Sequence, residues 1–269
     1  MLGILSGIPM GKVTKSLLVC ATPRSGSTLL CALLDGTGVA GRPQEYFERL
    51  AHSGLPRQPR EYFERVEDPK LLELLATTDP GTPDPGDPIP QALAEGTTDN
   101  GVFAAKLMWT HLLDLAERLG AKPGSPLPSG GLGRPADAAL LRERFPDPRY
   151  VHVTRRDKIA QAVSLWRAVQ TRAWRAGAVT ENGNAVYHAG AIGYLAGQLS
   201  DHDDAWRAWF SANRIEPLRV VYEELAADTS GVTAEVLEDL GVGPAEVPEP
   251  PLRRQGDDRS ARWVERYRA

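Results

Sequence analysis

Short apolar runs alternate with longer amphipathic segments along this chain of 269 residues. Four runs are apolar or β-branched and are bounded by polar or turn residues, so each predicts a buried strand. These runs span residues 16–21, 102–108, 150–155 and 218–223. Strands that alternate with helices favour a mainly parallel central sheet flanked by helices. The expected fold class is therefore α/β.

Three segments between these strands have the spacing of helices. Residues 27–38 begin with serine and threonine and end at glycine, which are typical start and stop signals. Residues 157–177 also end in glycine, and residues 187–213 predict one long helix. Two stretches, 77–90 and 121–135, are dense in proline and glycine and predict loops.

Neither loop clearly divides the chain, so we expect a flexible N-terminal leader over residues 1–15 and one domain over residues 16–269. The leader loosely resembles a signal peptide. However, Lys12 and Lys15 lie between its two apolar runs instead of ahead of them, which argues against that interpretation. No run approaches the roughly 18–20 unbroken apolar residues of a membrane helix, and we expect no membrane span.

The composition narrows the class of protein. Apolar residues make up 42% of the chain and charged residues 25%, as in globular proteins. The formal net charge of −4 argues against a nucleic-acid partner, which requires a basic surface. With only two cysteines, Cys20 and Cys31, no disulfide scaffold is expected, and we interpret the chain as a reduced, cytoplasmic protein.

The first predicted strand runs into the sequence TPRSGST and then into a helix. A strand, a short loop with glycine and a helix start can gather backbone N–H groups around a phosphate. ATPase loops of this type end in G-K-[ST], whereas Gly26 is followed directly by Ser27 and Thr28. The loop alone is weak evidence, because such turns are common. The candidate anion-binding residues are Thr22, Pro23, Arg24, Ser25, Gly26, Ser27 and Thr28.

Two further strands end in polar residues, and ligands bind at the carboxyl ends of parallel strands. Lys106 lies near the end of the second strand among apolar neighbours, where unpaired burial would be costly. The third strand runs into Arg155 and Arg156, and Ser164 follows eight residues after Arg156. That spacing is about two helical turns, so Arg156 and Ser164 can hold one phosphate together. Two anion sites favour a nucleotide with phosphates at two positions.

The pairing of TPRSGST with RRDKIAQAVS resembles PAPS-dependent sulfotransferases, in which a 5′-phosphosulfate loop is followed by an arginine and a serine eight residues later that hold the 3′-phosphate. The resemblance implies a P-loop-like sulfotransferase fold, PAPS as sulfuryl donor, no metal, and a homodimer. Within these enzymes, the chain most resembles the bacterial trehalose 2-sulfotransferase family. This implies a small carbohydrate acceptor, and trehalose is the first candidate. The similar segments are GVAGRPQEYFERL, QPREYF, KLMW, SLWRAVQTRAW, YHAGAI and RQGDDRSARWVERYR.

The resemblance also implies catalytic roles. In many animal sulfotransferases a histidine two residues beyond a lysine accepts the proton of the acceptor, but Met108 occupies that position. Glu45 is implied as the general base instead, with His188 as the next candidate. Arg24 and Lys106 would neutralise charge on the sulfuryl group and the leaving phosphate. The basic C-terminal segment, which closes over the nucleotide in this class, offers the candidates Arg254, Gln255, Arg259 and Ser260.

Other functions stay open at this point. The acceptor could be a glycoside of a secondary metabolite or a glycolipid. A P-loop kinase is a third possibility, but the absence of G-K-[ST] and the second phosphate site argue against it. Dependence on Mg²⁺ would distinguish a kinase from a sulfotransferase. A protein that only binds adenosine bisphosphate or glycans is disfavoured by the presence of both Glu45 and Lys106. The aromatic residues that we expect in the core are His152, Trp166, Trp174, Trp206 and Trp209.

Overall fold

The computed structural model describes residues 13–84, 86–120, 138–174, 185–249 and 258–269. Most of the predicted leader, the predicted loop at 121–135 and the candidates Arg254 and Gln255 lie outside these residues. Within the described part of the chain, no helix has both the length and the apolar character needed to cross a membrane.

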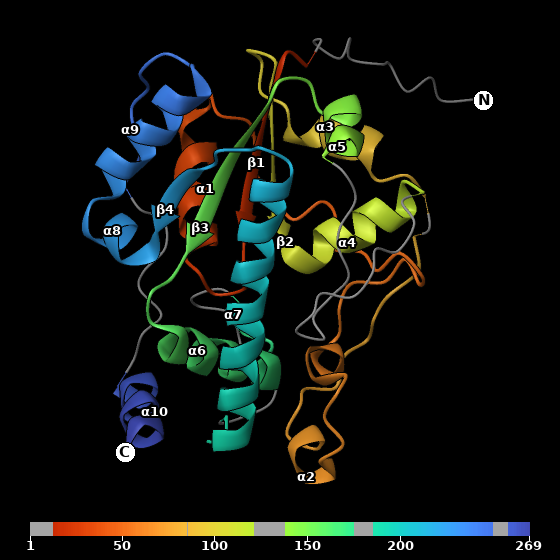
Figure 1. Cartoon of the computed structure of the whole chain (residues 1–269), viewed down its shortest axis with the longest axis vertical. Helices are drawn as coiled ribbons and strands as arrows, with labels where there is room; N and C mark the ends of the chain where they lie inside the picture. Colours follow the sequence, from red (N-terminus) through yellow and green to blue (C-terminus); the bar gives the residue numbers. More distant parts are fainter. Residues whose placement is uncertain (1–12, 85, 121–137, 175–184, 250–257) are drawn as a thin grey trace, which may run out of the picture.

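A four-stranded parallel sheet forms the centre of the molecule (Figure 1). Its strands are β1 (Lys15–Ala21), β2 (Val102–Met108), β3 (Pro148–Thr154) and β4 (Leu218–Val221), in the order β2-β1-β3-β4. All three pairings are parallel, which confirms the predicted class of sheet. The prediction for β4 was too long, because a helix begins at Tyr222 and two glutamates in its first turn favour a helix start there.

The three predicted helices are present, and the largest difference in their bounds is at the end of α6. Helix α1 spans Ser27–Thr37, and Gly38 in the left-handed conformation ends it as expected. Helix α6 spans Lys158–Thr171 and stops six residues before the predicted Gly177, because Arg172 takes the left-handed conformation with φ 59°. Helix α7 (Ala189–Ala212) is the long helix predicted. The remaining helices are η1 (Pro59–Phe63), α2 (Pro69–Leu72), α3 (Ile89–Gly96), α4 (Trp109–Arg118), α5 (Ala139–Arg144), α8 (Tyr222–Ala227), α9 (Thr229–Leu240) and α10 (Asp258–Arg268).

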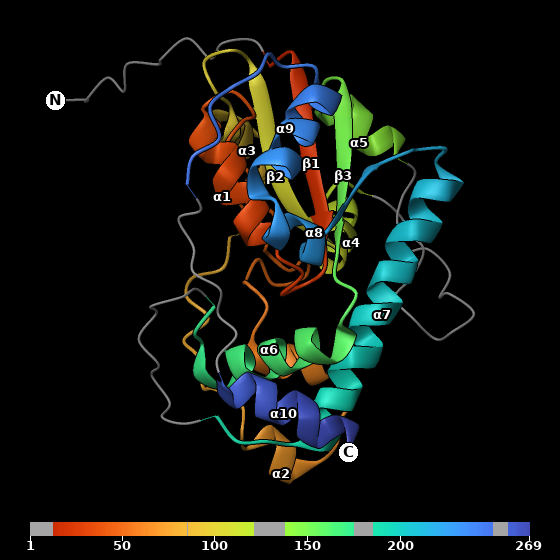
Figure 2. The same cartoon turned by 90° about the vertical axis from the view of Figure 1, so that its left-hand side faces the viewer.

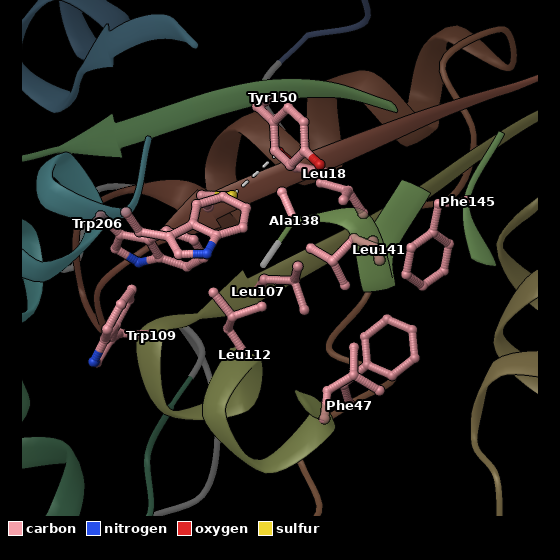
Figure 3. Close-up of a cluster of buried hydrophobic side chains, with 14 of the residues drawn as sticks. Leu18, Phe47, Leu107, Trp109, Leu112, Ala138, Leu141, Phe145, Tyr150 and Trp206 are labelled. Atoms are coloured by element: carbon pink, nitrogen blue, oxygen red, sulfur yellow. Dashed lines mark hydrogen bonds between the residues drawn. The ribbon is translucent and has the colours of Figure 1, made fainter. Parts of the chain in front are cut away.

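Side chains of β1 alternate between two cores, as the period of a strand requires. Leu17 and Val19 pack with α1, α8 and α9 on one face of the sheet. Leu18 and Cys20 pack with α3, α4, α5 and part of α7 on the other face, where Trp109 and Trp206 lie edge to face (Figure 3). Both cysteines are buried and free. The sheet is therefore held rigidly from both sides.

A third apolar cluster lies away from the sheet. It joins η1, α2, α6, α7 and α10, with α6 and α10 side by side in Figure 2. Phe63 packs edge to face on Trp166 at its centre. The loops at the carboxyl ends of the strands thus face a separate layer of helices, and the candidate site lies between the two.

Candidate active site

A cavity of about 1380 Å³ lies where the carboxyl ends of the four strands meet this helical layer. Ligands bind at this edge of a parallel sheet, and residues at or just after the ends of the strands line the cavity. Lys106 comes from β2, Arg155 follows β3, and Tyr222 follows β4. The sequence-predicted residues that line the cavity are Pro23, Arg24, Gly26, Ser27, Thr28, Glu45, Lys106, Ser164 and Ser260.

The loop after β1 presents the start of α1 to the cavity. Gly26 precedes the helix with φ 91°, and a Cβ atom there would lie 2.3 Å from Cδ2 of Tyr222, so only glycine fits. Gly26 has no side chain to cap α1, and the first turn carries no acidic residue. The N–H groups at the start of α1 can therefore bind an anion.

Thr22 and Ser25 are fully buried beneath this loop and support it from below. Gln161 on α6 donates one hydrogen bond to Thr22 Oγ1 (2.9 Å) and one to the carbonyl oxygen of Pro23 (2.7 Å). Thr22 in turn donates to Asp203 on α7 (3.3 Å), and Asp203 forms an ion pair with Lys158. Burial raises the pKa of Asp203. The sequence did not indicate Gln161 or Asp203, since both lie on helices far along the chain.

Arg24 is held in a defined position at the edge of the cavity. Its Nε atom donates to Ser164 Oγ (3.0 Å), and Nη1 donates to the carbonyl oxygen of Trp174 (2.6 Å). Burial, and then the neighbouring charge of Arg155, lower the pKa of Arg24 to about 10, so the side chain stays charged at neutral pH. Ser164 is thus joined to the first anion loop by Arg24.

The structure brings Arg155, not Arg156, beside the loop. The Arg155 guanidinium lies over the ring of Tyr222, 4.6 Å from its centroid, and donates to the carbonyl oxygen of Arg24 (3.3 Å). Arg156 has 62% of its side chain exposed, pairs with Glu224, and is not among the described residues that line the cavity. The spacing argument assumed that Arg156 belongs to the helix of Ser164, but it precedes the N-cap residue Asp157.

Lys106 joins the anion loop to the predicted base. Its Nζ atom lies 2.5 Å from Glu45 Oε1 and donates to Thr28 Oγ1 (3.0 Å), with only 7% of the side chain exposed. Glu45 reaches this position because Gln44 pairs alongside Ala105 of β2 and accepts a hydrogen bond from the backbone of Lys106 (2.9 Å). One buried cation therefore contacts both the anion loop and Glu45.

Glu48 and His111 lie beside Glu45, and the sequence did not indicate either. One side-chain atom of each of the three residues lies within 4.8 Å of the others. The backbone N–H of Met108 donates to His111 Nδ1 (3.4 Å), and burial lowers the pKa of His111 to about 4. The imidazole is therefore neutral and carries its proton on Nε2.

The spacing of this cluster would suit a metal ion, but its chemistry suits hydroxyl groups better. The Glu45 carboxylate already forms an ion pair with Lys106. His111 carries a proton on Nε2, so this atom is a hydrogen-bond donor and not a metal ligand. Burial, and next the charge of Glu45, raise the pKa of Glu48 to about 7. A charged carboxylate, a partly protonated one and an N–H donor can together donate to and accept from bound hydroxyls.

The predicted core aromatics are buried except for one. Trp166, Trp206 and Trp209 are at most 3% exposed, and His152 is 3% exposed, as expected. The prediction for Trp174 was wrong, because α6 ends before it and the side chain is 37% exposed at the cavity, 5.9 Å from the ring of Tyr62. The aromatic pair offers an apolar surface to a ligand.

Of the three remaining described candidates, one lines the cavity and two do not. Ser260 on α10 lines the cavity and accepts a hydrogen bond from Arg167 (2.5 Å), so α10 helps to close it. Arg259, the other described C-terminal candidate, is not among the described lining residues. His188 accepts a hydrogen bond from the backbone of Ala191 (3.1 Å) at the start of α7 and does not line the cavity within the described part of the chain.

The titration of Glu48 should be measurable in the stability of the protein. Its pKa rises from 4.5 to about 7 on folding, so the folded state binds this proton more tightly than the unfolded chain does. This group should therefore lower the free energy of unfolding as the pH rises between those values. We expect the Tm of Glu48→Gln, relative to wild type, to increase from pH 5 to pH 8. Parallel Tm curves for the two proteins would contradict the shift.

The parallel sheet, the uncapped helix start and the charged residues around it define a P-loop-like transferase of anionic groups. The chain belongs to the Stf0 sulphotransferase family, whose sequence model matches residues 16–269, and it is therefore a sulfotransferase. This assignment confirms the predicted class of enzyme and the predicted fold.

The relatives of the chain are similar over almost their whole length. It is 42% identical over 264 residues to a trehalose 2-sulfotransferase of Mycobacterium tuberculosis, with 97% of each chain covered. It is 42% identical over 261 residues to a trehalose 2-sulfotransferase of Mycolicibacterium smegmatis, with 93% of each covered. A crystal structure of a sulfotransferase from Alicyclobacillus acidocaldarius superposes with a TM-score of 0.47 and 12% identity, covering 94% of this chain and 90% of that one.

Proposed function

We propose that this sulfotransferase moves a sulfuryl group from PAPS to the 2-hydroxyl of trehalose, with Glu45 as general base and without a metal ion. The observation that carries the proposal is Lys106, which contacts Glu45 on one side and Thr28 of the anion loop on the other. A cation there can neutralise the transferred group while the base lies within reach of the acceptor. The two mycobacterial relatives support trehalose as the acceptor.

The proposed reaction is an in-line displacement at sulfur. The acceptor oxygen forms a bond to sulfur as the bond from sulfur to the 5′-phosphate oxygen breaks, and the hydroxyl proton passes to Glu45. The products are the sulfate ester and adenosine 3′,5′-bisphosphate. Negative charge grows on the leaving phosphate, where N–H groups of α1, Lys106 and Arg24 can stabilise it. Fixed donors of this kind make a Lewis acid unnecessary.

The size of the cavity supports two ligands. Pockets for a single small molecule are about 300–1,000 Å³. The cavity here, at about 1380 Å³, exceeds that range. Its anion-binding residues gather at the carboxyl ends of the strands, and Glu48, His111 and Trp174 line the same cavity beside them. A nucleotide donor and a disaccharide acceptor can therefore be accommodated together.

The direct test is a transfer assay with labelled PAPS and a panel of sugars that includes trehalose, other disaccharides and glycolipid head groups. Labelled trehalose sulfated at its 2-position is the expected product, at an unchanged rate in excess EDTA. Sulfation of a different glycoside, with none of trehalose, would identify another acceptor. Complete loss of activity in EDTA would overturn the metal-free mechanism.

The 3′-phosphate is expected to bind Arg155, in place of Arg156, which both the spacing and the family resemblance indicated. Arg155→Ala should weaken adenosine 3′,5′-bisphosphate by about 10–150-fold, since charge-assisted hydrogen bonds contribute about 1.5–3 kcal/mol. AMP, which lacks that phosphate, should bind almost as before. Arg156→Ala is the matched control, and calorimetry measures the affinity of both ligands for wild type and for the two variants. A larger loss in Arg156→Ala would restore the original assignment.

A homodimer in the cytoplasm completes the proposal. The family resemblance supports the dimer, and the two free buried cysteines support a reducing compartment. Light scattering at the assay concentration is expected to give twice the mass of one chain. A monomer mass with full activity would reject the dimer.

A further inference from the structure

Glu48 and His111 border the cavity at Glu45, yet the proposed transfer uses neither of them. Both line the cavity, and their functional atoms lie within 4.8 Å of each other and of a Glu45 oxygen. They come from different elements. Glu48 closes a turn in which its backbone N–H donates to the Glu45 carbonyl (3.2 Å), and His111 lies in the first turn of α4. The positions of Glu48 and His111 are therefore fixed by two different segments of the chain.

The three groups differ in what they offer to a ligand. Lys106 holds Glu45 in place, and the neutral His111 carries a donor on Nε2. With a pKa of about 7, Glu48 can donate or accept near neutrality. A sugar hydroxyl also donates and accepts, so two hydroxyls can be satisfied here at once. The charged or titratable groups that act on Glu48, apart from His111, are Glu45, Lys106, Arg49 and Arg57.

We propose that Glu48 and His111 bind the hydroxyl next to the one that is sulfated, so that the enzyme recognises its acceptor as a vicinal diol. Glu45 takes the proton of the reacting hydroxyl, and Glu48 with His111 fixes the neighbouring one. This inference rests on the proposed function of Glu45. It defines the acceptor class as sugars with a free hydroxyl adjacent to the reacting carbon, and it makes Glu48 a determinant of regiochemistry.

Paired acceptors test the diol directly. For wild type, kcat/KM with 3,3′-dideoxytrehalose is expected to be about 10–150-fold below that with trehalose, because the enzyme loses hydrogen bonds to a charged or buried group. In Glu48→Ala the two acceptors should react at nearly equal, low rates. Glu48→Gln, which keeps hydrogen-bonding capacity, should retain part of the preference. The remote control acceptor, 6,6′-dideoxytrehalose, should show the same ratio to trehalose in all three proteins.

An unchanged penalty for the 3-deoxy sugar in Glu48→Ala would overturn the inference, because the hydroxyl would then bind elsewhere. The increase in Tm with adenosine 3′,5′-bisphosphate shows that each variant is folded and binds the donor product. If wild type sulfates another sugar and not trehalose, the proposed acceptor is wrong. The comparison of that sugar with its deoxy analogue, in wild type and in Glu48→Ala, then tests separately whether Glu48 and His111 bind the neighbouring hydroxyl.

Discussion

Glu45→Gln is expected to lower turnover by about 10²–10⁴-fold, the usual contribution of a positioned general base. Glutamine keeps the shape of the side chain and can still hydrogen-bond to Lys106, but it cannot accept the hydroxyl proton. Adenosine 3′,5′-bisphosphate should bind nearly as tightly as to wild type, because Lys106 remains in contact with the anion loop through Thr28. Turnover at saturating acceptor and calorimetry of the product test the two parts.

The matched control is Glu61→Gln, another carboxylate in the lining of the cavity that caps η1 by accepting from the backbone N–H of Gln58 (2.5 Å). Its turnover should change far less. If Glu45→Gln keeps more than a few per cent of wild-type turnover, another residue is the base. His188 was the next candidate from the sequence, but its place at the start of α7 makes Glu48 the better one.

Lys106→Met is expected to be the second severe change. Removal of one preorganised donor from a charged transition state costs about 10²–10³ in turnover. The substitution also leaves Glu45 without its 2.5 Å partner and Thr28 without its 3.0 Å donor. Donor affinity should therefore fall as well, which separates this variant from Glu45→Gln. Rate measurements and calorimetry with the bisphosphate provide both values.

Lys106→Arg tests whether charge alone is sufficient. The lysine is 7% exposed, and a longer, planar guanidinium is not expected to fit between Glu45 and Thr28 without displacing one of them. Partial rescue of donor binding without rescue of turnover is the expected pattern. Wild-type turnover in Lys106→Met would show that another cation neutralises the leaving group.

The sheet could be predicted because its strands are short apolar or β-branched runs that are bounded by polar residues. The anion loop could be predicted for a related reason, since Gly26 interrupts the apolar pattern between β1 and α1. The contact between Glu45 and Lys106 could not be derived from the residues, because it depends on Gln44 pairing beside β2. Only the family resemblance indicated Glu45.

Two departures from the sequence predictions lie at the ends of helix α6. Counting from Arg156 to Ser164 treated both residues as part of one helix, whereas α6 begins at Lys158 and Arg156 precedes it. The prediction for Trp174 assumed that the same helix continues to Gly177, but Arg172 leaves it with φ 59° and no glycine marks the change. The sequence did not indicate Glu48 and His111, because they lie on two separate segments that only the fold brings together beside Glu45.

The residues that line the cavity come from two kinds of segment: the loops that directly follow the strands, and segments farther from the sheet. This difference affects which residues can change during evolution. Gly26 and Arg155 both contact the ring of Tyr222, so a change at any one of them disturbs the others. Glu48 and Trp174 lie on segments outside the sheet. Selection for a new acceptor can therefore change these two side chains, provided that the backbone carbonyl of residue 174 still accepts the hydrogen bond from Arg24. Directed-evolution libraries should concentrate there.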